Sequence, residues 1–135
     1  AAVVVMRDRT RQDYLILAPA DRLEASLRHD LRLPAAGRFS GAYAQVSGLG
    51  VRRQTRTPRT VTEGLVDYTA PPPGYALLNA ELGTTLRLAG RPLDINLSGT
   101  NLLNTTYRDY LNRYRYYLHE MGRNVSVRVR IPLGR

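Results

Sequence analysis

The chain has 135 residues, about the length of one ordinary domain, and it carries a formal net charge of +9. All 20 of its basic residues are arginine, and so basic a balance indicates an anionic partner: nucleic acid, lipopolysaccharide, phospholipid headgroups or an acidic ligand. Cysteine is absent, which excludes disulfides, thiolate metal sites and cysteine catalysis. No apolar run approaches the ~20 residues that a transmembrane helix requires.

Apolar and polar residues alternate in segment after segment, and this period of two is the dominant pattern of the chain. Successive side chains of a strand point to opposite faces, so each such segment is predicted as a strand with one apolar and one polar face. The pattern is sharpest in VSVRVRI, where valines alternate with Ser126, Arg128 and Arg130. In chain order, the predicted strands are Ala2–Arg9, Leu23–Leu33, Phe39–Arg53, Leu77–Leu88, Leu93–Gly99 and Val125–Ile131.

The connections between these segments differ in length. LPAAGR and LAGRP are short and contain glycine and proline, as tight hairpin turns do. RQDYLILAPAD, TRTPRTVTEGLVDYTAPPPG and the tyrosine-rich stretch before the last strand are longer. Short turns at one end and long loops at the other predict an all-β fold, an antiparallel up-and-down meander of about six strands.

The covering of the apolar face decides the class of protein. A soluble sheet needs a second layer, and the sequence offers no independent one. Lipid can cover that face instead if Arg128 and Arg130 point away from it, because a mid-membrane arginine costs about 2–4 kcal/mol. The pattern therefore favours a transmembrane β-barrel over a soluble sandwich. Six strands are too few to close such a barrel, so we expect the chain to be part of a larger one.

Three motifs in the carboxyl-terminal half carry a resemblance to a known family. They are PPGYALLNAELG from Pro72, LSGTNLLNTTYRDYL from Leu97 and MGRNVSVRVRIPL from Met121. In this order and spacing they resemble the carboxyl-terminal barrel strands of TonB-dependent outer-membrane receptors. The family's closing motif is an Asn-Leu-Leu-Asn element that is followed, after a loop, by Gly-Arg-Asn at the start of the last strand. The resemblance is weaker over Ala18 to Thr57.

The resemblance implies that residues 1–135 are the carboxyl-terminal part of a barrel of about 22 strands around a plug. The plug and the earlier strands are then absent from this sequence, and they would be the nearest partners of the segment. The implied parent protein lies in the bacterial cell outer membrane, and TonB drives its import of a scarce ligand such as a ferric siderophore. Its other contacts would be outer-membrane lipid and lipopolysaccharide, and not nucleic acid.

Alternation places a set of polar side chains on one face, and the resemblance implies that this face meets the lumen or the plug. For the charged members of the two middle strands, cross-strand salt bridges are the simplest expected role. The lumen- or plug-facing residues are Glu81, Arg87, Asp94, Asn96, Arg128 and Arg130.

Five of the nine tyrosines lie between Gly99 and Asn124, close to several arginines. The resemblance implies that this stretch leaves the membrane at the outer surface and forms an external loop, Arg108 to Met121. Tyr75 and Tyr107 would then lie at headgroup level, as aromatic girdles do. Tyrosine rings and arginines farther out could bind an anionic, aromatic or sugar-like ligand. The candidate ligand-binding residues are Tyr110, Arg113, Tyr114, Arg115 and Tyr117.

Two other interpretations of this stretch remain open. The same side chains could brace the loop and contact lipopolysaccharide phosphates without touching any ligand. Alternatively, apolar residues recur at helical spacing between Tyr107 and Met121, which predicts an amphipathic helix that binds RNA or a membrane surface.

Catalysis has little support in the sequence. His29 and His119 lie far apart and near no nucleophile motif, and no phosphate-loop pattern is present. We therefore expect no enzymatic activity, no cofactor and no metal site. The alternative function, from another class, is that of a soluble basic β-rich binding module that contacts nucleic acid or another anionic partner.

Overall fold

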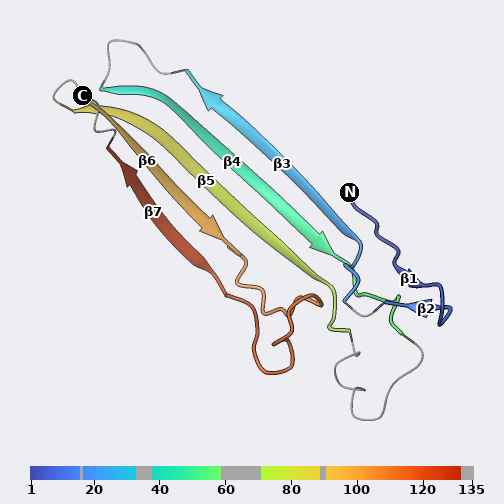
Figure 1. The fold of residues 1–135 in the computed structure, drawn as a ribbon. Coiled ribbons are helices and arrows are strands. Elements are labelled where there is room, and N and C mark those ends of the chain that lie inside the picture. The colour runs from blue at the N-terminus through green and yellow to red at the C-terminus, as the bar shows by residue number, and fades with distance from the viewer. Residues whose placement is uncertain (16, 33–37, 59–70, 89–90, 132–135) are drawn as a thin grey trace. The chain divides into compact units, whose positions relative to one another are not determined.

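The computed structural model describes residues 1–15, 17–32, 38–58, 71–88 and 91–131. These residues form an all-β structure without a helix (Figure 1). None of them belongs to a helical segment long and apolar enough to cross a membrane. The strands are β1 (Arg7–Asp8), β2 (Asp13–Tyr14), β3 (Arg22–Leu31), β4 (Phe39–Val51), β5 (Tyr75–Leu88), β6 (Arg91–Thr100) and β7 (Asn124–Arg130).

The main sheet has five strands in the order β3-β4-β5-β6-β7, which is also their order along the chain. Neighbouring strands run in opposite directions, so the predicted antiparallel meander is confirmed (Figure 1). Leu88 pairs directly with Arg91, so β5 and β6 are antiparallel neighbours, and Ala89 and Gly90 of the expected turn LAGRP lie outside the described residues. Most of the other predicted turn, LPAAGR, lies outside the described residues.

The predicted sixth strand, Ala2–Arg9, is wrong. Its residues contribute an isolated bridge between Ala2 and Arg22 and the two-residue strand β1, which pairs with β2. Residues 2–6 are consecutive apolar residues without alternation, and the chain turns after Asp8, whose Oδ1 accepts hydrogen bonds from the backbone N–H groups of Thr10 (2.8 Å) and Arg11 (3.2 Å). This side chain turns the backbone and ends the strand after two residues.

The register of β5, β6 and β7 mostly pairs apolar residues with apolar residues, and polar residues with polar residues or glycine. Leu82 pairs with Leu97, which pairs with Val127, and this row is apolar. The next row is polar: Gly83 pairs with Asn96, which pairs with Arg128. A further polar row consists of Thr85, Asp94 and Arg130. Because the side-chain period is two, the two polar rows share one face and the leucine–valine row occupies the other.

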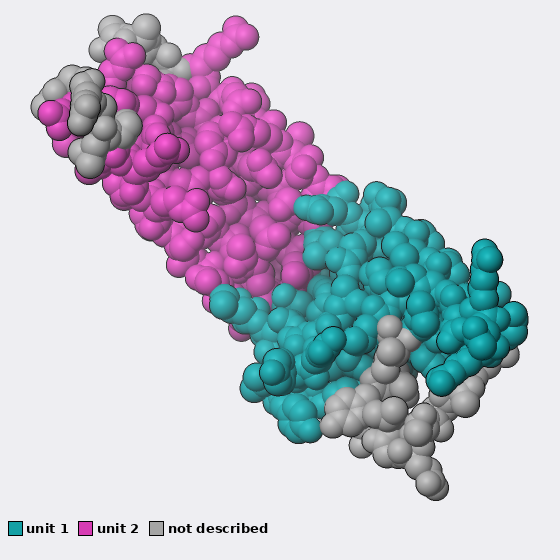
Figure 2. Space-filling model, viewed as in Figure 1, with its two compact units in different colours: residues 1–24, 49–76, 105–122 teal, residues 25–48, 77–104, 123–135 magenta. Residues whose placement is uncertain are grey.

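The chain divides into two compact units, which Figure 2 colours separately. Unit 1 comprises residues 1–24, 49–76 and 105–122, and it contains the buried apolar residues Ala18, Ala20, Val51 and Tyr110. Unit 2 comprises residues 25–48, 77–104 and 123–135 and holds most of the sheet. In unit 2 the apolar rows stay exposed: Leu82 is 52% exposed and Val127 is 65% exposed.

Candidate functional site

A polar cluster crosses the sheet of unit 2 on the predicted lumen face, with one side chain from each strand. Asn96 of β6 donates from Nδ2 to the Glu81 Oε1 of β5 (2.6 Å) and to the Tyr43 hydroxyl of β4 (2.9 Å). The Tyr43 hydroxyl in turn donates to Glu81 Oε1. On β3, the Arg28 guanidinium lies 3.8 Å from the centroid of the Tyr43 ring, which is a cation–π contact. Arg128 of β7 pairs with Asn96 in register.

Gly83 makes room for this cluster. The Tyr43 ring lies directly over Gly83, and a Cβ added there would overlap the Cε1, Cζ and hydroxyl oxygen atoms of Tyr43. The ring can therefore cross the strand and reach Glu81 and Asn96 only because residue 83 has no side chain. Sequence reasoning did not single out Tyr43. The alternation of Tyr43, Gln45 and Ser47 with Ala44 and Val46 was the available signal.

The predicted salt bridges among Glu81, Arg87 and Asp94 are wrong. The ion pairs that the described residues form are Arg28–Asp30 and Arg56–Asp21. Register explains this, because Arg87 pairs with Pro92 and Glu81 pairs with Ser98, so neither meets an opposite charge across β5 and β6. Asp94 instead accepts a hydrogen bond from the Thr85 hydroxyl at 2.8 Å. The polar face is held by hydroxyl and amide partners, which a charge pattern alone does not reveal.

Tyr75 and Tyr107 lie together at one end of β5, in unit 1. Their ring centroids are 4.3 Å apart and the rings are tilted by 34°. The Tyr75 hydroxyl donates to Asp109 Oδ2 at 2.6 Å. Burial, and then the charges of Glu120 and Asp109, raise the pKa of Tyr107. These contacts make a rigid aromatic pair at the base of the segment that precedes β7.

The tyrosine-rich segment 105–122 folds around a buried arginine. Arg115 is 4% exposed, and its guanidinium carbon lies 4.7 Å from both the Tyr110 and the Tyr116 ring centroids. Its Nη1 donates to the Tyr110 carbonyl (3.0 Å) and its Nη2 to the Tyr116 hydroxyl (3.1 Å). Tyr110 is likewise 4% exposed, and burial raises its pKa. Tyr110 and Arg115 brace the segment from inside. The prediction that these two side chains lie on its ligand-facing surface is therefore wrong.

The other candidate ligand residues are accessible. Tyr114 is 67% exposed, Tyr117 is 72% exposed, and Arg113 is exposed as well. The segment consists of turns, such as the one in which the Tyr114 N–H donates to Asn112 Oδ1 at 2.8 Å, so the helical alternative is wrong. Sequence spacing could not separate the inward from the outward side chains, because no strand or helix period governs them. Ligand contact by Arg113, Tyr114 and Tyr117 stays a prediction.

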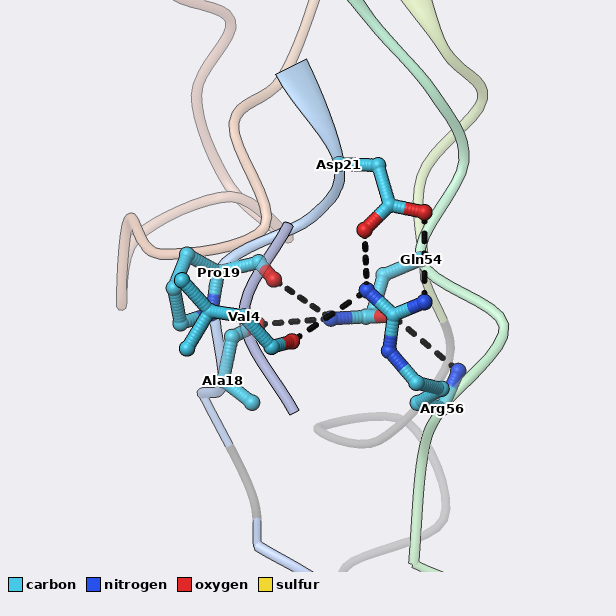
Figure 3. A network of polar contacts seen from close by, with 6 residues as sticks. All are labelled: Val4, Ala18, Pro19, Asp21, Gln54 and Arg56. Atoms are coloured by element: carbon cyan, nitrogen blue, oxygen red, sulfur yellow. Dashed lines mark hydrogen bonds and ion pairs between the residues drawn. The ribbon is translucent and has the colours of Figure 1, made fainter. Parts of the chain in front are cut away.

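A second polar network, which sequence reasoning missed, joins the segment before β3 to the segment after β4 (Figure 3). Gln54 is buried and donates from Nε2 to the carbonyls of Ala18 (2.8 Å) and Pro19 (3.0 Å). Arg56 binds both carboxylate oxygens of Asp21. This hydrogen-bonded pairing holds the pKa of Asp21 below its ordinary value.

No protein-family model, curated protein or solved structure matches the chain. Nor do the described ranges bring together three or more His, Asp or Glu side chains in a way that could hold a metal ion. The functional argument therefore rests on the sheet, on its two unlike faces and on the motifs of the sequence.

Proposed function

We infer that the chain is the carboxyl-terminal part of the β-barrel of a TonB-dependent outer-membrane receptor, a barrel of about 22 strands around a plug. The observation that carries this proposal is the contrast between the two faces of the β5-β6-β7 sheet. One face presents Leu82, Leu97 and Val127, all exposed, and the other presents Asp94, Asn96, Arg128 and Arg130.

The energetics favour lipid on the apolar face. Burying an exposed leucine or valine side chain is worth roughly 1.5–3 kcal/mol, and no second layer among the described residues supplies that burial. Arginine on the same face would oppose insertion by about 2–4 kcal/mol at mid-membrane depth. The register keeps Arg128 and Arg130 off that face, so the pattern suits a barrel wall.

The remaining features take roles that follow from this proposal. The polar cluster around Glu81 and Asn96 faces the lumen and the plug of the parent protein. Tyr75 and Tyr107 lie at the outer headgroup level, and the exposed Arg113, Tyr114 and Tyr117 meet lipopolysaccharide or a ligand such as a ferric siderophore. Import of that ligand depends on TonB acting on the parent protein. A soluble basic module for an anionic partner is the competing function.

The proposal is tested by the gene and by the solubility of its product. The DNA upstream of the Ala1 codon should encode, in frame, a signal peptide, a plug and further alternating strands. The complete protein should then need detergent to leave the membrane fraction. A start codon directly upstream of Ala1, together with a product that stays folded and dispersed without detergent, would contradict the proposal and favour the soluble module.

A further inference from the structure

A cavity of about 350 Å³ lies within unit 1, at the base of the segment 105–122. Two tyrosine rings, two hydroxyls, one guanidinium and one imidazole line it, and the side chains that supply them are Tyr75, Tyr107, Thr105, Thr106, Arg108 and His119. None of the candidate ligand residues of the sequence analysis belongs to this lining. Its volume is at the small end of the range for ligand pockets, enough for one ring with a substituent.

The lining contains a cation with an unfilled hydrogen-bonding group. Arg108 Nε is buried, and it has no hydrogen-bond partner among the residues that the structure describes. That nitrogen is closed off from solvent, so a ligand in the cavity would meet the terminal guanidinium nitrogens of Arg108, to which the described residues offer no ion pair. Arg108 is therefore the residue of this cavity that most needs an acceptor.

The lining contains no carboxylate, although two acidic residues lie close to it in sequence. Asp109 accepts hydrogen bonds from the Tyr75 hydroxyl (2.6 Å) and from the Leu111 N–H (2.7 Å). Glu120 accepts one from Asn112 Nδ2 at 2.6 Å. Both carboxylates thus already accept hydrogen bonds, Asp109 from a tyrosine of the cavity wall, and the donors left at the cavity include those of Arg108, Thr106 and His119.

The two tyrosine rings of the cavity wall favour a ligand with a planar ring. The Tyr75 and Tyr107 ring centroids are 4.3 Å apart, and the Tyr75 hydroxyl is bound to Asp109, so the two rings support each other. Thr105 is also fixed, because its hydroxyl donates to the Ala76 carbonyl at 3.0 Å. A rigid aromatic wall beside a cation favours a ring that bears an oxyanion.

We propose that this cavity binds an oxyanion, a phosphate or a carboxylate, that is carried on a ring, with Arg108 as its principal anchor. Thr106 and His119 contribute further donors, and the tyrosine pair packs against the ring. This proposal rests on the proposed function, because that function places the segment 105–122 where it can meet a ligand. A phosphorylated sugar of an outer-leaflet lipid and a free anionic ligand offer the same chemistry.

The test is calorimetric titration of the complete protein in neutral detergent micelles with phenyl phosphate, inorganic phosphate and benzyl alcohol. Phenyl phosphate should bind. Inorganic phosphate, which has no ring, and benzyl alcohol, which has no charge, should each bind at least about tenfold more weakly. Arg108→Gln should weaken phenyl phosphate binding about tenfold or more, and Arg108→Lys, which keeps the charge, should weaken it less. Far-ultraviolet circular dichroism checks that each variant keeps its sheet.

Arg123→Gln is the matched control, because Arg123 is an exposed arginine directly after the segment, does not line the cavity and has no proposed role in binding. Its affinity for phenyl phosphate should stay within about twofold of the parent chain. Equal losses in the two glutamine variants, or an Arg108→Gln variant that binds like the parent, would overturn the proposal. Competition then assigns the source: a lipid that bears a phosphorylated sugar, added to the same micelles, displaces phenyl phosphate if a lipid headgroup is the natural occupant, and otherwise a free ligand is. A failed titration leaves the membrane assignment untouched, since that depends on the two faces of the sheet.

Discussion

The contact between Tyr43 and Gly83 yields the sharpest prediction about stability. Gly83→Ala places a methyl group where the Tyr43 ring now lies, so the ring must move and lose its hydrogen bonds to Glu81 and Asn96. Overpacking of this kind costs about 1–3 kcal/mol, and a hydrogen bond to a charged group is worth about 1.5–3 kcal/mol. The substitution should therefore destabilise the chain by about 3 kcal/mol, against a gain of about 0.5–1 kcal/mol expected from replacing a strand glycine elsewhere.

Urea unfolding in detergent micelles, followed by circular dichroism, measures this difference. Gly48→Ala is the matched control, because a Cβ at Gly48 in β4 has nothing within 4 Å. It should leave the free energy of unfolding unchanged or slightly raised. Tyr43→Ala combined with Gly83→Ala should lose less than the sum of the two single variants, since the clash is gone. A Gly83→Ala variant as stable as Gly48→Ala would refute the reasoning.

Three further predictions concern unit 1. Arg56 lowers the pKa of Asp21 in the folded chain, so the pair stabilises the fold fully above the unfolded pKa of about 3.9. This stabilisation is lost as the pH falls through the lower, folded pKa. Asp21→Asn should therefore flatten the pH–stability profile in this acidic range. Arg115→Ala should destabilise unit 1 by about 2–4 kcal/mol in urea unfolding, since two rings and two hydrogen bonds lose their partner, whereas Arg113→Ala should change it by less than about 0.5 kcal/mol. Tyr75→Phe should loosen the start of β5, seen as faster backbone amide exchange there, because Asp109 loses its donor.

Much of the sheet could be predicted from the sequence because one physical rule governs it. Where one face is apolar and the other polar, a period of two marks the strand and sets the register, as in β5, β6 and β7. The rule failed at Ala2–Arg9, where apolar residues follow one another without alternation and Asp8 turns the backbone. It places Tyr43 on the polar face but does not reveal its contact with Gly83, which depends on the missing side chain of a glycine on the next strand.

The segment 105–122 was less predictable for a related reason. Arg115 packs against Tyr110 and Tyr116 in the bracing role that the sequence left open, yet no periodic backbone tells which side chains point inward. Tyr110 and Arg115 turned inward, and Arg113, Tyr114 and Tyr117 outward, through turns closed by Asp109 and Asn112. The cavity beside Arg108 arises from residues of two separate segments, 73–75 and 105–119, and sequence alone does not bring them together.

The central claim, that lipid covers one face of the sheet and water the other, is tested most directly at Val127 and Arg128. The chain contains no cysteine, so, once any cysteines in the rest of the complete protein are replaced, Val127→Cys and Arg128→Cys each place a single spin label on adjacent residues of β7. The measurement is label accessibility in the complete protein in native outer membranes, to oxygen from the lipid phase and to a water-soluble nickel complex. The account predicts that oxygen reaches the label at residue 127 and the nickel complex the label at residue 128. Equal access of the nickel complex to both labels would contradict it.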